Sequence, residues 1–114
     1  MLTDDDKQRY LDRGFLLGDQ VLDEAEIEKL RAELARVLEA RVLEDRDRDD
    51  RPQPVLLRNF GREEAPVWQI VNIWEAGEPF RRLSRKPELA EAAATLLQTD
   101  DVRVWHDQIQ YKPA

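Results

Sequence analysis

The chain has 114 residues, of which 41% are hydrophobic and 38% charged, so it is long enough for one domain and too short for two of ordinary size. Its 18 basic and 25 acidic side chains leave a net charge of −7, which argues against the basic surface that nucleic acid or anionic lipid requires. No cysteine is present, which excludes disulfides and thiol chemistry, and the single histidine, His106, excludes a metal site that needs two imidazoles from one chain.

The N-terminus carries three consecutive acids, Asp4 to Asp6, where a signal peptide needs basic and then apolar residues. No window approaches the length of apolar sequence that spans a membrane. We therefore expect a cytoplasmic protein with no membrane or nucleic-acid partner.

The first expected helix is short and has a start and a stop signal. Thr3 is a typical N-cap residue, the three acids that follow favour the positive end of the helix dipole, and Gly14 is a typical C-terminal residue. After Gly14, the apolar run Phe15–Leu17 predicts a short buried extended segment.

A second helix is expected to begin at Asp23, with Glu26 in the position of an acidic capping box. One stripe of this helix is apolar at helical spacing: Ile27, Leu30, Leu34, Val37 and Leu38. The stripe is too short for the sustained heptads of a coiled coil, so we favour packing within its own domain over a partner-binding coiled coil. Residues 1–43 are thus predicted to be helical.

A highly charged stretch, residues 44–54, follows this helix. Alternating acids and arginines up to Arg51, then Pro52 and Pro54, predict a mobile connector on the surface because no apolar residue is available for a core.

The remaining residues, 55–114, predict strands and short helices. Val55–Leu57 and Val67–Trp74 are the first two expected strands. In the second strand, alternation places Asn72 and Trp74 on the face of Trp68 and Ile70, and Gln69 on the other face.

Two helices and a final strand are expected next. Pro79 and Pro87 suit the first turn of a helix. The second of these helices has an apolar stripe that is expected to be buried: Leu89, Ala92, Ala93, Leu96 and Leu97. Val102–Lys112 is the expected final strand.

Alternation divides the final strand into two different faces. One face carries His106, Gln108 and Gln110, and the other carries Trp105, Ile109 and Tyr111. Either the polar face lines a cavity, where its groups find hydrogen-bond partners, or it is exposed and the aromatic face lies in the core. The pattern leaves these alternatives open.

Familiar catalytic motifs are missing from the sequence. His106 and Asp107 are neighbours on a strand and point to opposite faces, and no serine lies in a nucleophile-elbow motif. A glycine-rich phosphate loop is also absent.

Several stretches together resemble bacterial members of the phytanoyl-CoA dioxygenase family. They are Arg13–Phe15, Val67–Glu75, Pro79–Leu83 and Val102–Pro113, and they occur in the family's order along the whole chain. The resemblance implies an oxidoreductase of the non-haem Fe(II)/2-oxoglutarate-dependent dioxygenase class on a double-stranded β-helix, or jelly-roll. Such enzymes hold iron with two histidines and one carboxylate.

The family's iron ligands are not found in these residues. The expected His-x-Asp is absent because Asp107 directly follows His106, and a second histidine does not occur. We therefore expect a truncated α+β segment: the N-terminal helices and first strands of an incomplete jelly-roll. We expect this chain alone to bind no Fe(II) or 2-oxoglutarate and to be inactive.

The resemblance carries over few site residues. It implies that Gln108 borders the 2-oxoglutarate pocket, and that Lys112, Gln69 and Asn72 are weaker pocket-lining residues, with no catalytic residue or metal ligand in the chain. The implied partners are the remainder of the oxygenase domain and a small-molecule or acyl substrate. Self-association is expected if the last strand leaves an edge exposed.

Two rival hypotheses remain. One is a catalytically inactive, free-standing module that binds a partner helix through the Ile27–Leu38 stripe. The other is a truncated gene product without activity.

Overall fold

The computed structural model describes residues 2–42 and 56–113, so the predicted connector over 44–54 lies outside the described residues. The protein is of the α+β class, with helices and a three-stranded antiparallel sheet. It divides into two compact units: residues 1–23 with 85–103, here the helical unit, and residues 24–84 with 104–114, here the sheet unit. None of the described helices is long and apolar enough to cross a membrane.

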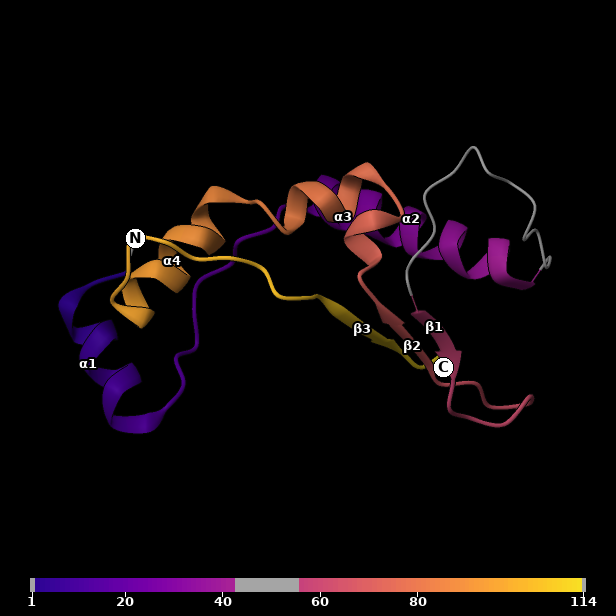
Figure 1. Cartoon of the computed structure of the whole chain (residues 1–114), viewed down its shortest axis with the longest axis horizontal. Coiled ribbons are helices and arrows are strands. Elements are labelled where there is room, and N and C mark those ends of the chain that lie inside the picture. Colours follow the sequence, from indigo (N-terminus) through magenta and orange to yellow (C-terminus); the bar gives the residue numbers. More distant parts are fainter. Residues whose placement is uncertain (1, 43–55, 114) are drawn as a thin grey trace. The chain divides into compact units, whose positions relative to one another are not determined.

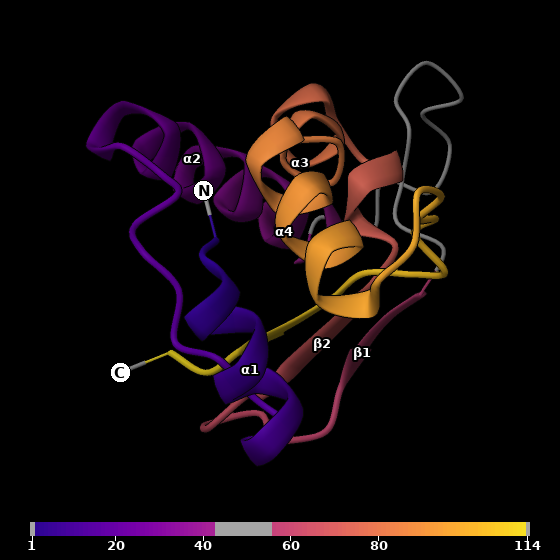
Figure 2. The ribbon, with the colours of Figure 1, turned by 90° about the vertical axis from the view of Figure 1, so that its left-hand side faces the viewer.

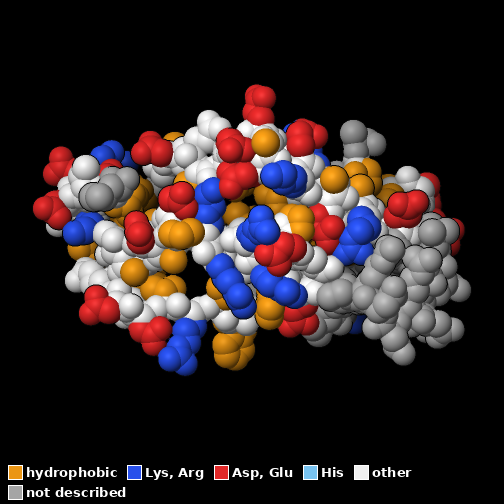
Figure 3. All heavy atoms as spheres, turned by 90° about the horizontal axis from the view of Figure 1, so that it is seen from above, with side chains coloured by type: hydrophobic (Ala, Val, Ile, Leu, Met, Phe, Trp, Pro, Cys, Tyr) orange, Lys and Arg blue, Asp and Glu red, His pale blue; other side chains and the backbone are white. Residues whose placement is uncertain are grey.

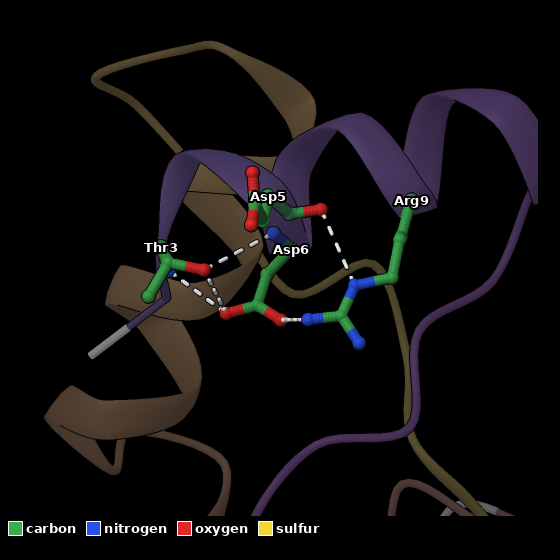
Figure 4. Close-up of polar contacts among 4 residues, drawn as sticks. All are labelled: Thr3, Asp5, Asp6 and Arg9. Atoms are coloured by element: carbon green, nitrogen blue, oxygen red, sulfur yellow. Dashed lines mark hydrogen bonds and ion pairs between the residues drawn. The ribbon is translucent and has the colours of Figure 1, made fainter.

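The helical unit contains α1 (Asp4–Arg13) and α4 (Pro87–Leu97), which contact each other (Figure 2). The predicted cap at Thr3 is confirmed and is a full capping box, since the Thr3 hydroxyl accepts from the Asp6 backbone N–H and the Asp6 carboxylate accepts from the Thr3 N–H (Figure 4). At the other end Gly14 has φ 77°, and its N–H donates to the Tyr10 carbonyl at 2.8 Å. Local signals therefore fix both ends of α1.

Two predictions of burial in the helical unit are wrong. Phe15 and Leu17 are 64% and 93% exposed, and no described strand pairs with this segment. In α4, no residue of the predicted stripe is buried, and Leu89 and Leu97 are exposed. An apolar pattern leads to burial only where a second surface covers it, and α1 contacts only part of α4.

The core of the sheet unit forms where α2 (Glu24–Val42) and α3 (Glu78–Leu83) meet the sheet (Figure 1). Among the residues whose burial the structure describes, five are buried: Val37, Ile70, Ile73, Ala76 and Phe80. Leu30, Leu34 and Leu38 of the predicted stripe pack against them, so the expected packing of this helix within its own domain is confirmed. The helix begins at Glu24, directly after Asp23 as predicted.

Arg36, which forms an ion pair within α2, ties this helix to the residues before α3. The Arg36 guanidinium donates to both carboxylate oxygens of Glu33, at 2.6 and 3.0 Å, and to the carbonyl oxygen of Ala76 at 2.7 Å. The hydrogen bond to Glu33 raises the pKa of Arg36, against the opposing effect of burial. Arg36 thus fixes α2 on the turn that leads into α3.

The sheet has the order β1 (Leu56–Asn59), β2 (Trp68–Val71), β3 (Gln108–Tyr111), with both neighbouring pairs antiparallel. The strand predicted over Val67–Trp74 therefore ends earlier. Asn72 takes left-handed backbone angles (φ 59°, ψ 41°) and starts a 3-10 turn, η1 (Ile73–Glu75), so Asn72 and Trp74 do not continue the face of Trp68 and Ile70. Proline lies in the first turn of both α3 and α4, as predicted for Pro79 and Pro87.

The final strand is shorter than predicted. Residues 102–107 are not part of the sheet, and only Gln108–Tyr111 pair with β2. Trp105 is 92% exposed, so the alternative that places the aromatic face in the core does not hold for this residue. Within β3 the alternation holds, with Ile109 and Tyr111 half-buried and Gln108 and Gln110 exposed. In these four residues the polar face is exposed and the face of Ile109 and Tyr111 lies toward the core, which is the second of the two alternatives that the sequence left open.

Candidate functional site

The antiparallel register brings polar side chains from all three strands into one row. Arg58 of β1 lies opposite Gln69 of β2, and Gln69 lies opposite Gln110 of β3. Residues opposite one another in antiparallel strands project from the same face. This face, here the polar face, includes Arg58, Gln69, Val71, Gln108 and Gln110.

The opposite face of the sheet is mostly apolar. Ile70 is fully buried, and Ile109, directly opposite it on β3, packs against the same core as α2 and α3. The polar face is therefore the side of the sheet that does not pack against this core.

The structure brings together two of the four predicted site residues. Gln69 and Gln108 share the polar face, where Gln69 is half-buried and Gln108 exposed. Lys112 is exposed and directly follows β3. Asn72 lies past the end of β2, in the turn, so it does not belong to the polar face.

Asn72 has a different environment, beside Asp107. Its backbone N–H donates to the Asp107 carbonyl at 3.0 Å, one step beyond the pair Val71–Gln108, and so extends the register of β2 and β3. The Oδ1 atoms of both residues are buried and have no hydrogen-bond partner among the described residues. Both can accept a hydrogen bond from an N–H or O–H group.

Arg58 was missed by the sequence analysis. Its guanidinium carbon lies 5.5 Å from the centroid of the Phe60 ring, and no described carboxylate forms an ion pair with it. The predicted strand ended at Leu57, and continuing the alternation by one residue would have included Arg58. A guanidinium beside glutamine amides can bind a carboxylate through several hydrogen bonds.

An open groove of about 570 Å³ lies in the helical unit, and it contains none of the predicted site residues. Its lining includes Asp4, Lys7, Gln8 and Leu11 of α1 and Ala94 and Thr95 of α4. Lys7 already forms an ion pair with Asp4 at 3.1 Å, and no pair of nucleophile and base is found among these side chains. The groove has no arrangement that indicates chemistry.

The charges of the described surface are mixed. Acidic and basic side chains are interspersed over the face seen in Figure 3, with hydrophobic groups among them. On that face, the described residues form no large patch of a single sign.

The residues of this chain do not fit the iron site of the resembled family. His106 is the only histidine, and its side chain is exposed. Among the described residues, no three histidine, cysteine or acidic side chains are grouped so that they could hold a metal ion. A two-histidine ligand set is therefore not contained in these residues.

Comparison with known proteins gives no match, either to a protein-family model, to a curated protein or to a solved structure.

Proposed function

We propose that this chain is the N-terminal part of a non-haem Fe(II)/2-oxoglutarate-dependent dioxygenase resembling the phytanoyl-CoA dioxygenase family. In this proposal β1, β2 and β3 are the first strands of a double-stranded β-helix. The proposal rests on the run Val102–Pro113 together with Val67–Glu75, the two stretches with the most family-like sequence. The register between β2 and β3 pairs these two stretches in space, which supports reading them as one functional unit.

The polar face supports the same proposal. When helices cover one face of a sheet and the sheet curves into a jelly-roll, the other face lines the interior. Here α2 and α3 pack on the face of Ile70, so the proposal assigns Gln69 and Gln108 to the interior of the complete domain, although Gln108 is exposed in this chain. In this assignment Gln108 donates its amide hydrogens to 2-oxoglutarate, while Gln69 and Lys112 border the co-substrate or substrate.

Iron ligation has no place in these residues, so the proposal assigns the ligands to the remainder of the oxygenase domain. The substrate, a small or acyl molecule, would be bound jointly by both parts. Turnover therefore requires the complete domain.

A free-standing helix-binding module is the competing function. It would need the Ile27–Leu38 stripe to be available to a partner helix. Val37 is 1% exposed, and Leu30, Leu34 and Leu38 pack against the core of the sheet unit, so this chain already covers most of the stripe. This packing favours the oxygenase proposal.

The protein encoded by the complete reading frame provides the test. Gln108→Leu should raise the apparent dissociation constant for 2-oxoglutarate several-fold and leave the fold intact. The reason is that the hydrogen bond of a pocket amide contributes about 0.5–1.5 kcal/mol to binding. Isothermal titration with 2-oxoglutarate measures the change.

Gln8→Leu, the same exchange at an exposed position of α1, is the matched control and should leave the affinity unchanged. Equal affinities for wild type and Gln108→Leu would show that the polar face does not line the co-substrate pocket.

A further inference from the structure

The strand order leaves β3 at one edge of the sheet, with no described strand beyond it (Figure 1). The hydrogen bond from the Asn72 N–H to the Asp107 carbonyl shows that Asp107 directs its backbone groups toward β2. In an antiparallel ladder this direction alternates along the strand. Ile109 and Tyr111 therefore also face β2, and the N–H and C=O groups of Gln108 and Gln110 point outward from the open edge.

The edge of β3 lacks the features that usually prevent pairing with another chain. Natural edge strands are protected by charged side chains, prolines or bulges. The four residues Gln108–Tyr111 include none of these, with Asp107 directly before them and Lys112 and Pro113 directly after, whereas the opposite edge strand, β1, carries Arg58 within the strand. Two apolar side chains just before β3, Val104 and Trp105, are 56% and 92% exposed. The β3 edge is therefore the better site for an added strand.

We propose that a second copy of this chain pairs antiparallel with β3, about a two-fold axis, so that two three-stranded sheets form one six-stranded sheet. Residues opposite one another must share a face, so Ile109 can pair only with a core-side residue of the other copy. The proposed axis passes beside Ile109, which lies opposite the partner's Ile109.

This register has a chemical reason. It places the two isoleucines in a non-hydrogen-bonded pair, where side chains of neighbouring strands come closest, and extends the apolar face of the sheet across the axis. Gln108 then lies opposite the partner's Gln110, and their outward backbone groups form the ladder. Two-fold pairing uses the β3 edge of both copies, whereas pairing of β3 with β1 would propagate into a fibre. Because the strands are short, the dimer should be weak and depend on concentration.

Sedimentation equilibrium of the 114-residue chain over a wide range of concentration tests the proposal, and a reversible monomer–dimer equilibrium is expected. Two variants of the exposed glutamines then test the register. The double variant Gln108→Glu with Gln110→Glu places like charges opposite each other at both pairs and should weaken the dimer about tenfold. The double variant Gln108→Lys with Gln110→Glu places opposite charges there and should dimerise at least as tightly as wild type.

Both variants alter only exposed side chains, so each should keep the fold of the wild type. An amide NMR spectrum of each variant checks this. A strictly monomeric wild-type chain would overturn the proposal and leave the edge for a strand of the same polypeptide. Equal weakening by both variants would overturn the proposed register. Neither result depends on oxygenase activity, so this proposal and the proposed function can fail separately.

Discussion

At the residue scale, the missing side chain of Gly77 leaves room for the ion pair between Glu33 and Arg36 of α2. A Cβ atom at this position would overlap the carboxylate of Glu33, which receives two hydrogen bonds from Arg36. Gly77→Ala should displace that carboxylate and lower the free energy of unfolding by about 1–2 kcal/mol, since the Glu33–Arg36 pair is partly buried. Urea denaturation measures the change.

Gly18 provides the matched control, because nothing lies within 4 Å of the Cβ position there. Gly18→Ala should leave stability unchanged or raise it slightly, by up to about 1 kcal/mol. If both variants had the same stability, the close approach at Gly77 would have no energetic consequence.

Asp6 makes the start of α1 sensitive to pH. The hydrogen bond from the Thr3 hydroxyl, at 2.6 Å, is the main cause that lowers the pKa of Asp6, followed by the Thr3 backbone N–H, and Arg9 adds an ion pair at 2.7 Å (Figure 4). A lowered pKa in the folded state means that ionised Asp6 stabilises α1 above the ordinary pKa of an aspartate. That contribution is lost as the pH falls through the lowered value.

The pKa of Asp6 should therefore depend on the hydrogen bond from Thr3. Thr3→Ala should raise the pKa of Asp6 toward the ordinary aspartate value, as measured by NMR titration of the side-chain carboxyl carbon. Thr99→Ala, which removes a hydroxyl far from Asp6 in sequence, should leave the titration unchanged. An Asp6 pKa that is the same with and without Thr3 would contradict this assignment.

At the element scale, the sequence predicts where helices begin and end better than it predicts which apolar side chains are buried. Thr3, Gly14, Pro79 and Pro87 act through their own backbone or their nearest neighbours, so the helix boundaries they predict are found. Burial depends on which surfaces meet, and the predictions for Phe15–Leu17 and the α4 stripe are wrong for that reason. An apolar pattern alone does not identify the surface that would cover it.

The candidate site follows the same rule. Alternation alone puts Gln108 with Gln110, and Gln69 with Val71, because it depends only on the strand itself. That these two groups share one face with Arg58 depends on the register between strands, which the sequence does not contain as a local pattern. The left-handed backbone of Asn72 ends β2 early and could not be read from strand-forming side chains.

Buried and exposed large side chains of the sheet unit should respond differently to truncation. Ile70 is fully buried between the sheet and the helices, so Ile70→Ala should cost about 2–5 kcal/mol through lost burial and a cavity. Trp105→Ala removes a larger side chain that is 92% exposed, and should change stability by less than about 0.5 kcal/mol. Thermal or urea unfolding of both variants provides the comparison, and a large loss for Trp105→Ala would show that this side chain is covered in solution.

At the scale of the whole molecule, the hydrophobic core is unevenly distributed. The five buried residues of the described part of the chain all belong to the sheet unit, and neither α1 nor α4 of the helical unit contains a buried residue. The polar face that carries the functional proposal lies in the unit with the core, so the scaffold of the proposed pocket is the best-packed part of the described chain.

The measurement that tests the central claim most directly is 2-oxoglutarate-dependent succinate formation with added Fe(II), for this chain and for the product of its complete reading frame. The account predicts no succinate above a metal-only control from the 114 residues, because they hold a single histidine. It predicts sustained succinate from the complete product, with a His-x-Asp following Pro113 in its sequence. Succinate formation by the 114-residue chain alone, or a complete reading frame without His-x-Asp and without activity, would contradict the account.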